Sequence, residues 1–220
     1  MNIYRLAGDL SHAASIWILL WRLHKSKSAL GISLKTQELF LVVFMARYLD
    51  LFTHFISLYN SFMKIMYLTS TSAIIYLMRM KPTYRATYDA SQDSFLHWQF
   101  AVAPSVVLGL IISLISAGGF SFMEWMWTFS IVLEATAIIP QLIVLQRYRE
   151  VENLTGNYIF ALGLYRALYL CNWVYRAYHE PNYQHSYVAY LCGVAQTALY
   201  IDFFYYYIIS KARGGTLIVK

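Results

Sequence analysis

Residues Phe120–Leu145, FSFMEWMWTFSIVLEATAIIPQLIVL, form a long apolar stretch that contains only two charged side chains. A helix that crosses a bilayer needs roughly 20 mostly apolar residues, so this stretch is long enough to cross. The whole chain has the same character, because 59% of its 220 residues are hydrophobic and only 13% are charged. The sequence therefore predicts an integral membrane protein of the all-α class.

Six further apolar stretches flank this one, so we predict seven transmembrane helices. The others are Leu6–Leu23, Thr36–Ser57, Ser61–Met78, Leu96–Ile115, Asn157–Tyr178 and Tyr187–Ser210. Seven helices use about 140 positions, which excludes a large soluble domain. We interpret residues 1–220 as one membrane domain with two parallel three-helix repeats, at about 1–80 and 120–210. A linker helix at about 96–115 joins the repeats, and residues 211–220 form a tail.

The basic residues predict the orientation of the chain in the membrane. Twelve of the 17 follow spans one, three, five and seven: Arg22, Lys25, Lys27, Lys35, Arg79, Lys81, Arg85, Arg147, Arg149, Lys211, Arg213 and Lys220. Because short basic loops stay in the cytosol, the N-terminus is predicted to be lumenal or extracellular and the C-terminus cytosolic. The same asymmetry explains the formal net charge of +6 through contact with bilayer lipid, so no nucleic-acid partner is expected.

Ionisable side chains at bilayer depth are costly unless they face a cavity or a partner, so each is a candidate functional residue. Four spans carry such residues, with aromatic and amide side chains, in stripes at helical spacing. They are Arg5, Asp9 and His12; Arg47, Asp50 and His54; Glu124, Trp127 and Glu134; and Tyr165, Arg166, Tyr169, Asn172, Trp173 and Arg176. We expect these stripes to line a shared cavity that opens to the lumen.

The arginines in these stripes have two interpretations. They could form internal salt bridges, for example Arg47 with Asp50 or Glu134. They could instead bind the carboxylates of a ligand, because a guanidinium offers a planar fork of donors at any physiological pH. The distance from Arg166 to Arg176 along a helix is about 15 Å, and four extended residues span about 13–14 Å, so a tetrapeptide would fit.

Other local patterns are less specific. Cys-x-x-Cys, His-Glu-x-x-His, Gly-x-Ser-x-Gly and phosphate-loop motifs are absent, so we expect neither an enzyme nor a cofactor. Cys171 and Cys192 lie in apolar stretches and are predicted to be buried and reduced. Pro140-Gln141 indicates either a kink in span five or a superfamily motif. The run Asp202–Tyr207 is typical of an aromatic interfacial belt.

Seven sequence blocks, spread over nearly the whole chain, match the pattern of a known family. They are MNIYRLAGDLSH at the N-terminus, GIS-x-K-x-Q at Gly31–Gln37, RYLDLFTHFISLYN at Arg47–Asn60, ATYD at Ala86–Asp89, WTFSIVLE at Trp127–Glu134, LGLYRALYLCNW at Leu162–Trp173 and QTALYIDFFYYY at Gln196–Tyr207. Together they resemble the KDEL receptor family, the ER lumen protein-retaining receptors. Pro140-Gln141 also resembles the motif of the wider PQ-loop superfamily, whose SWEET-like seven-helix fold is similar to the predicted repeats.

The resemblance implies a receptor that binds the C-terminal Lys/His-Asp-Glu-Leu signal of ER-resident proteins that have escaped to the Golgi. It implies that the receptor binds in the acidic Golgi, releases in the neutral ER and returns its cargo in COPI vesicles. The expected location is therefore the membrane of the endoplasmic reticulum, the cis-Golgi and COPI vesicles. The superfamily leaves one alternative, a PQ-loop transporter of small solutes.

The resemblance also implies roles for particular residues. The carboxylates of the signal would be received by Arg5, Arg176 and, at the C-terminal carboxylate, Arg47. The pocket for the basic first residue would comprise Asp50, Glu124 and Trp127. Tyr48 is a further ligand-binding position, and the supporting wall would comprise Tyr165, Arg166, Tyr169 and Trp173. Asn172 and Asp202 would be supporting polar residues, and Lys211 and Arg213 would lie in a cytosolic sorting tail.

His12 and Glu134 resemble the proton-sensing group of the family. Histidine ordinarily titrates with a pKa near 6.5. Protonation of His12 in a mildly acidic compartment would add positive charge and favour an acidic peptide.

Overall fold

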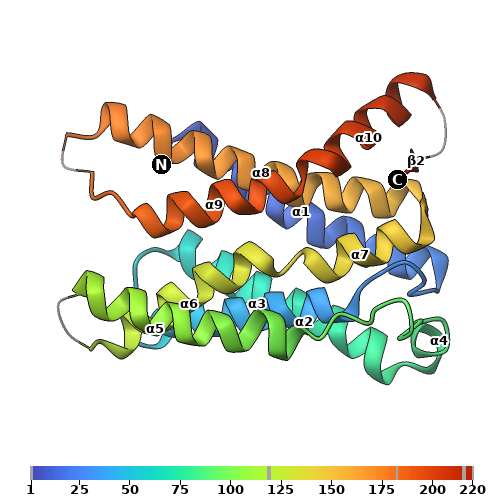
Figure 1. Ribbon diagram of the computed structural model, residues 1–220, viewed down its shortest axis with the longest axis horizontal. Coiled ribbons are helices and arrows are strands. Elements are labelled where there is room, and N and C mark those ends of the chain that lie inside the picture. The colour runs from blue at the N-terminus through green and yellow to red at the C-terminus, as the bar shows by residue number, and fades with distance from the viewer. Residues whose placement is uncertain (1, 118–119, 182, 215–216, 220) are drawn as a thin grey trace. The chain divides into compact units, whose positions relative to one another are not determined.

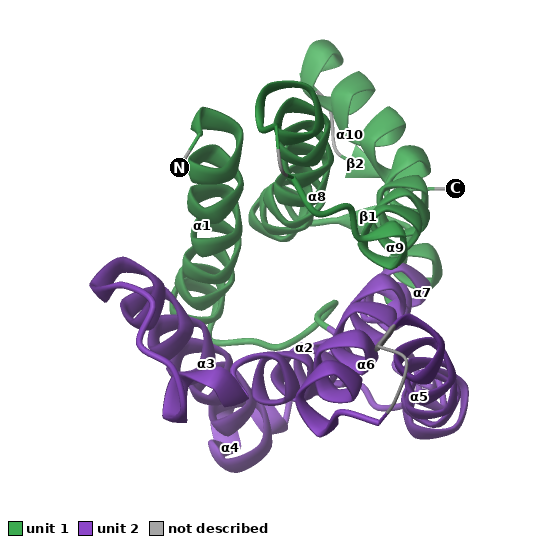
Figure 2. Ribbon diagram, turned by 90° about the vertical axis from the view of Figure 1, so that its left-hand side faces the viewer, with its two compact units in different colours: residues 1–32, 144–220 green, residues 33–143 purple. Residues whose placement is uncertain are grey.

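The structure is a computed structural model that describes residues 2–117, 120–181, 183–214 and 217–219. Nearly all of its regular structure is helical (Figure 1), which is consistent with the predicted all-α membrane class. The chain packs as two compact units: unit 1 comprises residues 1–32 and 144–220, and unit 2 comprises residues 33–143 (Figure 2). The predicted division into two repeats and a linker helix stays a prediction.

Unit 1 is built on two long helices, α1 (Ile3–Ser26) and α8 (Asn153–His179), which pack along each other. The Asn2 side chain fixes the start of α1, since it accepts the Arg5 backbone N–H at 2.9 Å. Helices α9 (Tyr187–Leu199) and α10 (Ile201–Arg213) follow, with a bend of 43° between them. Strand β2 (Leu217–Ile218) pairs antiparallel with β1 (Glu150–Val151).

Arg22 ties three segments of unit 1 together. Although it was assigned above to a basic loop, it lies within α1 and is only 4% exposed. Its Nε donates to the Glu152 carboxylate at 2.8 Å, and its two terminal nitrogens donate to the backbone carbonyls of Ser28 and Leu30. Glu152 is the N-cap residue of α8. Arg22 therefore links the end of α1, the loop that follows it and the start of α8.

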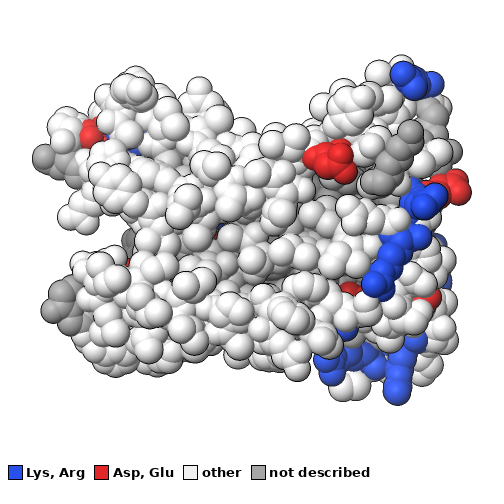
Figure 3. Space-filling view, in the orientation of Figure 1, with Lys and Arg blue, Asp and Glu red and all other residues white. Residues whose placement is uncertain are grey.

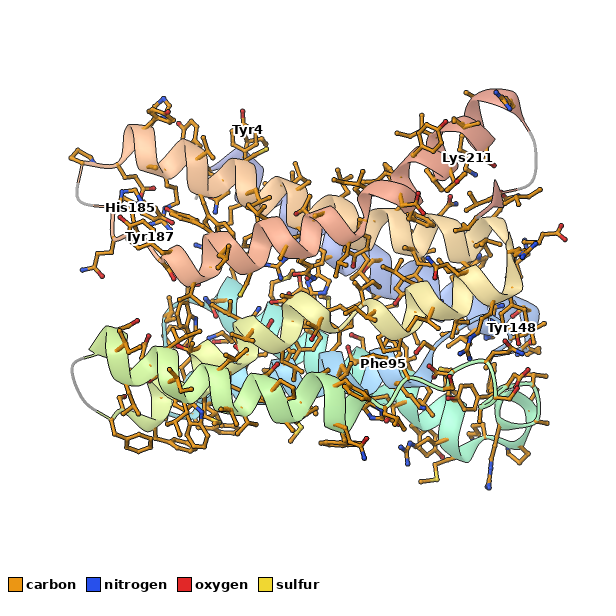
Figure 4. The ribbon with its side chains drawn as sticks, viewed as in Figure 1. Tyr4, Phe95, Tyr148, His185, Tyr187 and Lys211 are labelled. Atoms are coloured by element: carbon orange, nitrogen blue, oxygen red, sulfur yellow. The ribbon has the colours of Figure 1, made fainter. Side chains whose placement is uncertain are left out.

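In unit 2, α2 (Leu34–Arg47) packs against α3 (Leu58–Met80) and α6 (Phe122–Thr136), and α5 (Ala103–Ala117) packs against α6. The short α4 (Pro82–Arg85) follows α3, and a π-helical turn, η2 (Trp98–Val102), leads into α5. Phe95 lies in the connection before that turn (Figure 4). Helix α7 (Ile139–Tyr148) runs from unit 2 into unit 1.

Gly109 permits the close approach of α5 to α6. A Cβ atom at this position would lie 2.7 Å from the Phe129 Cα and 2.8 Å from its backbone nitrogen. These are backbone atoms that no side-chain rotation can move, so a larger residue must separate the helices. Small residues serve this purpose in membrane helix pairs.

We therefore expect Gly109→Ala to destabilise the protein by about 1–3 kcal/mol, as overpacking does elsewhere. The measurement is thermal unfolding of the purified protein in detergent. Ser116→Ala, at an exposed position of the same helix, is the control and should leave the melting temperature unchanged. Equal melting temperatures for Gly109→Ala and the unmodified protein would show that the helices are not in this contact.

Each of the seven predicted stretches corresponds to helical segments. Fewer of these helices are both long enough and apolar enough to cross a membrane. Among the described residues, Trp98–Ser116 and Phe122–Tyr148 are long and apolar enough to cross, and the bent pair α9 and α10 would be a third span. The other long helices carry charged residues within them. Apolar helices that could span a membrane are thus present, while seven spans and their orientation stay predictions.

Most of the basic side chains visible on the drawn face lie toward one end of each unit. Figure 3 shows most of the blue there, a smaller blue patch beside red at the opposite end, and a middle that is largely white. The basic side chains of the first group come from helix ends. In unit 1 they include Arg147 at the end of α7 and Lys211 and Arg213 at the end of α10. In unit 2 they include Arg79 and Arg85, in the last turns of α3 and α4. This separation suits an apolar middle in lipid and charged ends in water.

The second predicted span differs from the expectation. Helix α2 ends at Arg47 and is followed by a 3₁₀ turn, η1 (Leu49–Phe52), so Arg47, Asp50 and His54 do not form one α-helical stripe, and Arg47 is not mid-helix. The Asp50 carbonyl accepts the N–H groups of both Thr53 and His54, which closes the chain into a turn. The Asp50 side chain is held by Lys64 of α3 at 2.6 Å.

The fifth predicted span is broken near Pro140, as a proline kink predicts. Helix α6 ends at Thr136, and α7 begins at Ile139 with Pro140 in its first turn, where the missing N–H costs least. Gln141 is fully buried: its side-chain oxygen accepts the Ser33 N–H at 2.9 Å, and its backbone N–H donates to the Thr36 hydroxyl at 3.0 Å. The PQ pair therefore anchors the start of α2.

Asp93 completes this anchor at the start of α2. Its carboxylate accepts the Ser33 hydroxyl at 2.8 Å, the Lys35 backbone N–H at 3.2 Å and the Tyr88 hydroxyl at 2.7 Å. Burial and the bond to Asp93 raise the pKa of Tyr88 well above its usual range, so its hydroxyl keeps the proton that it donates. An anion at a helix N-terminus is also favoured by the helix dipole.

The prediction that both cysteines are buried is wrong. Cys171 and Cys192 are not joined in a disulfide, but Cys171 is exposed and Cys192 is partly exposed on the protein surface. The physical reason is that a membrane helix presents apolar residues to lipid as well as to its neighbours, so apolar sequence surroundings do not imply burial within the protein.

Candidate functional site

Arg47, the last residue of α2, directs its guanidinium toward α6. Its Nε donates to the Ser130 hydroxyl at 3.1 Å, and its Nη1 forms a salt bridge with the Glu134 carboxylate. Its Nη2 is buried and has no hydrogen-bond partner among the described residues. Because a buried donor without a partner is costly, Nη2 is a candidate donor to a ligand.

This geometry decides between the internal partners considered for Arg47. The salt bridge with Glu134 is confirmed, whereas the alternative with Asp50 is wrong, because Asp50 pairs with Lys64. Glu134 is only 2% exposed, so its charge is balanced by Arg47 within unit 2. The pair uses one of the three guanidinium nitrogens and so does not exclude a ligand role for Arg47.

Helix α6 presents the predicted acidic and aromatic stripe. The helix is continuous from Phe122 to Thr136, so Glu124, Trp127 and Glu134 lie along one face. Glu124 is in the first turn, where the Ser121 hydroxyl caps the helix, and both Glu124 and Trp127 are partly buried. Ser130, which the sequence analysis did not single out, lies one turn before Glu134 and was detectable by that i, i+4 spacing.

In unit 1, α8 brings its polar face against α1. His12 stacks on Tyr165 with ring centroids 4.2 Å apart, at an interplanar angle of 9°. The Arg166 guanidinium lies over the same Tyr165 ring, 5.0 Å from its centroid, and donates to the Tyr165 hydroxyl at 3.2 Å. His12 and Arg166 are both buried. A protonatable ring and a guanidinium are thus held by one tyrosine.

The same face continues through Tyr169, Asn172 and Trp173. The Tyr169 hydroxyl donates to the Asp9 carboxylate, and Asn2 donates to the Asn172 side-chain oxygen at 2.7 Å. The rings of Tyr169 and Trp173 meet at 69° with centroids 6.3 Å apart. Asn2 was missed by the sequence analysis, although its position immediately before a predicted helix is that of an N-cap.

Arg176 lies near the end of α8 that leads into α9. It pairs with Glu180 at 2.8 Å and stacks over the Tyr183 ring at 4.4 Å. Arg5, at the first turn of α1, is partly exposed, as Arg176 is. His185, in the connection before α9, lies close to Tyr187, the first residue of α9 (Figure 4), and the His185 Nδ1 is 2.9 Å from the Tyr190 hydroxyl.

The remaining candidates lie along α10. Asp202 is exposed in the first turn of that helix, where the dipole favours an acidic side chain. Lys211 lies at the opposite end of α10, over the Tyr207 ring at 5.4 Å and 3.4 Å from the Asn153 side-chain oxygen (Figure 4). Arg213 is exposed next to the αL cap residue Gly214.

These groups suit recognition of a charged peptide better than catalysis. In unit 1 the guanidinium groups of Arg166 and Arg176 lie beside tyrosine rings, and in unit 2 the Arg47 guanidinium keeps one donor nitrogen for a carboxylate. Across the described part of the chain, no group of three or more His, Cys, Asp or Glu side chains could hold a metal ion.

Comparison with known proteins is decisive for the family. The sequence profile of the family described as ER lumen protein retaining receptor matches residues 28–176. The ER lumen protein-retaining receptor of Petunia hybrida is 53% identical over 217 residues, which are 99% of this chain and 98% of that protein. The chain belongs to the ER lumen protein-retaining receptor family. Receptor B of Arabidopsis thaliana is 51% identical and the Drosophila melanogaster receptor 50%, each with the same coverage.

Membership in this receptor family confirms the resemblance seen in the sequence blocks. It also confirms that the chain is a receptor and not an enzyme. The transporter alternative is not favoured, because the full-length relatives above are named as receptors. The family name and the apolar helices together indicate a membrane protein associated with the ER.

Proposed function

We propose that this chain is a Golgi-to-ER retrieval receptor that binds the C-terminal Lys/His-Asp-Glu-Leu signal of escaped ER residents. It binds in the acidic Golgi, releases in the neutral ER and returns with its cargo in COPI vesicles. The observation that supports ligand binding most directly is Arg47, whose buried Nη2 has no hydrogen-bond partner among the described residues. The family supports the kind of ligand, a protein of the ER lumen.

The proposed ligand contacts follow the residue assignments made above. The terminal carboxylate of the signal binds Arg47 beside Tyr48, and its acidic side chains bind Arg5 and Arg176, with Arg166 supporting them. Charge-assisted bonds from a planar guanidinium are the strongest and most directional contacts available to a carboxylate. Asp50, Glu124 and Trp127 bind the basic first residue; carboxylates and an aromatic face both attract a cation.

Delivery of a secreted reporter tests the proposed retrieval. In cells that lack their own receptor, a reporter ending in Lys-Asp-Glu-Leu should be secreted, and expression of this chain should retain it. The control reporter carries two extra residues after the Leu, so the signal no longer ends in a free carboxylate. It should be secreted whether or not the chain is expressed. Secretion of the signal-bearing reporter despite expression of the chain in the Golgi and ER would contradict the proposal.

His12 provides a test of the pH dependence. It stacks on Tyr165, which Arg166 also contacts, and it lies one turn from Asp9 on α1. Protonation adds a positive charge, which favours an acidic peptide, so affinity should increase as the pH falls through the ordinary histidine range. We expect the unmodified protein to bind roughly tenfold more tightly at about pH 5.5 than at about pH 7.4, and His12→Ala to lose most of that difference.

The measurement is titration calorimetry with a peptide ending in Lys-Asp-Glu-Leu at both pH values. His24→Ala is the matched control, because His24 is on the same helix but exposed near its other end. Its pH dependence should equal that of the unmodified protein. The same pH dependence in His12→Ala would remove His12 from the proton-sensing role.

A further inference from the structure

Asp9 is a buried carboxylate within α1 to which the assigned ligand contacts give no role. It is only 7% exposed, and it lies between Arg5 and His12 on the same helix. Isolated carboxylates in a membrane helix are costly, so one that is retained there usually serves a partner. One partner of Asp9 is the Tyr169 hydroxyl of α8, which donates to the Asp9 Oδ1.

The Tyr169 ring is held in place independently of its hydroxyl. A Cβ atom on Gly8 would lie 2.9 Å from Cδ2 and 3.0 Å from Cε2 of this ring, so one edge of the ring approaches α1 closely at a position where glycine leaves room. The ring also contacts Tyr165 edge-on, with centroids 6.2 Å apart at 85°. With the ring fixed in this way, Asp9 determines the direction of the hydroxyl hydrogen.

This direction determines what Tyr169 can offer to a ligand. A phenol has one hydrogen and oxygen lone pairs, whereas an ionised carboxylate only accepts hydrogen bonds. When Asp9 takes the hydrogen, the Tyr169 oxygen is left as an acceptor. It is therefore suited to a donor and unsuited to the carboxylates that the arginines bind.

We propose that Asp9 is a positioning residue that makes Tyr169 a hydrogen-bond acceptor for a donor group of the peptide signal. The donor is a backbone N–H of the signal or the ammonium of its first side chain. This inference rests on the proposed function, because it requires that the chain bind the peptide signal. In this arrangement the arginines bind the carboxylates of the signal. The Tyr169 oxygen, whose hydrogen is directed to Asp9, accepts a hydrogen bond from a donor of the signal.

The test deletes the donors of the peptide one at a time. The probe is a peptide ending in Lys-Asp-Glu-Leu, together with ester analogues in which one backbone N–H becomes an oxygen, and an analogue with norleucine in place of the lysine. For each protein variant, the measured quantity is the ratio of the dissociation constant of an analogue to that of the parent peptide. A ratio is insensitive to a variant that merely lowers the fraction of folded protein.

In the unmodified protein, one analogue should bind roughly three- to tenfold more weakly because of its bond to Tyr169, the usual effect of one neutral hydrogen bond. In Tyr169→Phe the ratio for that analogue should fall by this three- to tenfold factor, because the bond to Tyr169 is absent for both peptides. In Asp9→Asn the ratio should fall as well, because the amide can donate to the Tyr169 oxygen and reverse the bond. Asp9→Asn added to Tyr169→Phe should change the ratio no further. Glu150→Gln, an exposed acid of the same unit, is the control and should keep the original ratio.

Two results would overturn the inference. In the first, each analogue has the same ratio in Tyr169→Phe and in Asp9→Asn as in the unmodified protein. That result would show that Tyr169 accepts no hydrogen bond from the peptide. A ratio that changes in Asp9→Asn but not in Tyr169→Phe would show that Asp9 does not act through Tyr169. Either result with tight binding of the parent peptide leaves the proposed function intact, whereas absence of parent binding to the folded, unmodified protein overturns both.

Discussion

Replacing Arg47 by lysine is expected to weaken the binding of a free-acid Lys-Asp-Glu-Leu peptide by roughly 10- to 100-fold. A bond to a charged group contributes about 1.5–3 kcal/mol, and lysine supplies a point charge instead of a planar fork. The guanidinium here serves Ser130 through Nε and Glu134 through Nη1, which leaves Nη2 for the ligand. A lysine ammonium that stays paired with the buried Glu134 cannot also reach the ligand carboxylate that Nη2 of Arg47 would bind.

The unit contains a matched control for this substitution. Arg79 also pairs with a glutamate, Glu38, but its side chain is 55% exposed and lies at the other end of the helices. Arg79→Lys should therefore leave the affinity unchanged. The measurement is calorimetric titration of folded variants with the free-acid peptide and its C-terminal amide. If Arg47→Lys weakens both peptides equally, or if Arg79→Lys has a similar effect, Arg47 does not bind the terminal carboxylate.

Removal of the Arg22 side chain should cause the largest loss of stability. Its guanidinium is buried and donates to Glu152 and to the carbonyls of Ser28 and Leu30. A buried acceptor that loses its partner costs about 1–3 kcal/mol, so two carbonyls and an ion pair give a loss of about 2–5 kcal/mol for Arg22→Ala. Glu152 is 46% exposed, so water can solvate it and its contribution is the smallest.

Thermal unfolding in detergent measures this effect. Lys25→Ala removes an exposed basic residue three positions later and should leave the melting temperature unchanged. Arg22→Lys should be nearly as harmful as alanine, because one ammonium cannot reach two carbonyls and a carboxylate. If Arg22→Ala melts at the same temperature as Lys25→Ala, the three segments are not held by this side chain.

The sequence predicted the helical class and most helix positions because apolar runs and caps are local features. The break at Pro140 was equally local, since a proline cannot continue the backbone hydrogen bonding of a helix. The end of α2 at Arg47 has no such local signal in the sequence. Arg47 lies inside the predicted apolar stretch Thr36–Ser57, and the turn after it contains Asp50, whose side chain pairs with Lys64 on the next helix.

The candidate site shows the same limit. Stripe spacing singled out Glu134, His12 and Tyr169 as candidates, because periodicity places residues on one face of one helix. Arg47 was singled out in the same way, although its helix ends at that residue. The spacing does not show which helix faces pack against each other. The contacts of Tyr169 with Asp9 and Gly8, and of Arg47 with Ser130, join residues far apart in the chain, and only the packing of helices brings them together.

The burial of Arg22 was hidden for a related reason. A basic residue at the end of an apolar run ordinarily marks the border of a solvated loop, so Arg22, in the last turn of the predicted span Leu6–Leu23, was grouped with Lys25. The difference arises because α1 continues to Ser26 and α8 starts beside it. Likewise, Cys171 looked buried because its neighbours are apolar, yet it is exposed on the surface of α8.

The central claim is that this receptor recognises a C-terminal carboxylate at acidic pH, and one titration tests it most directly. Purified protein is titrated with a peptide ending in Lys-Asp-Glu-Leu, as the free acid and as the C-terminal amide, at about pH 5.5 and about pH 7.4, on either side of the histidine range. We predict tight binding of the acid at the lower pH, weaker binding at the higher pH and loss of binding on amidation. Equal affinity for acid and amide, or no binding of the acid at either pH, would contradict the account.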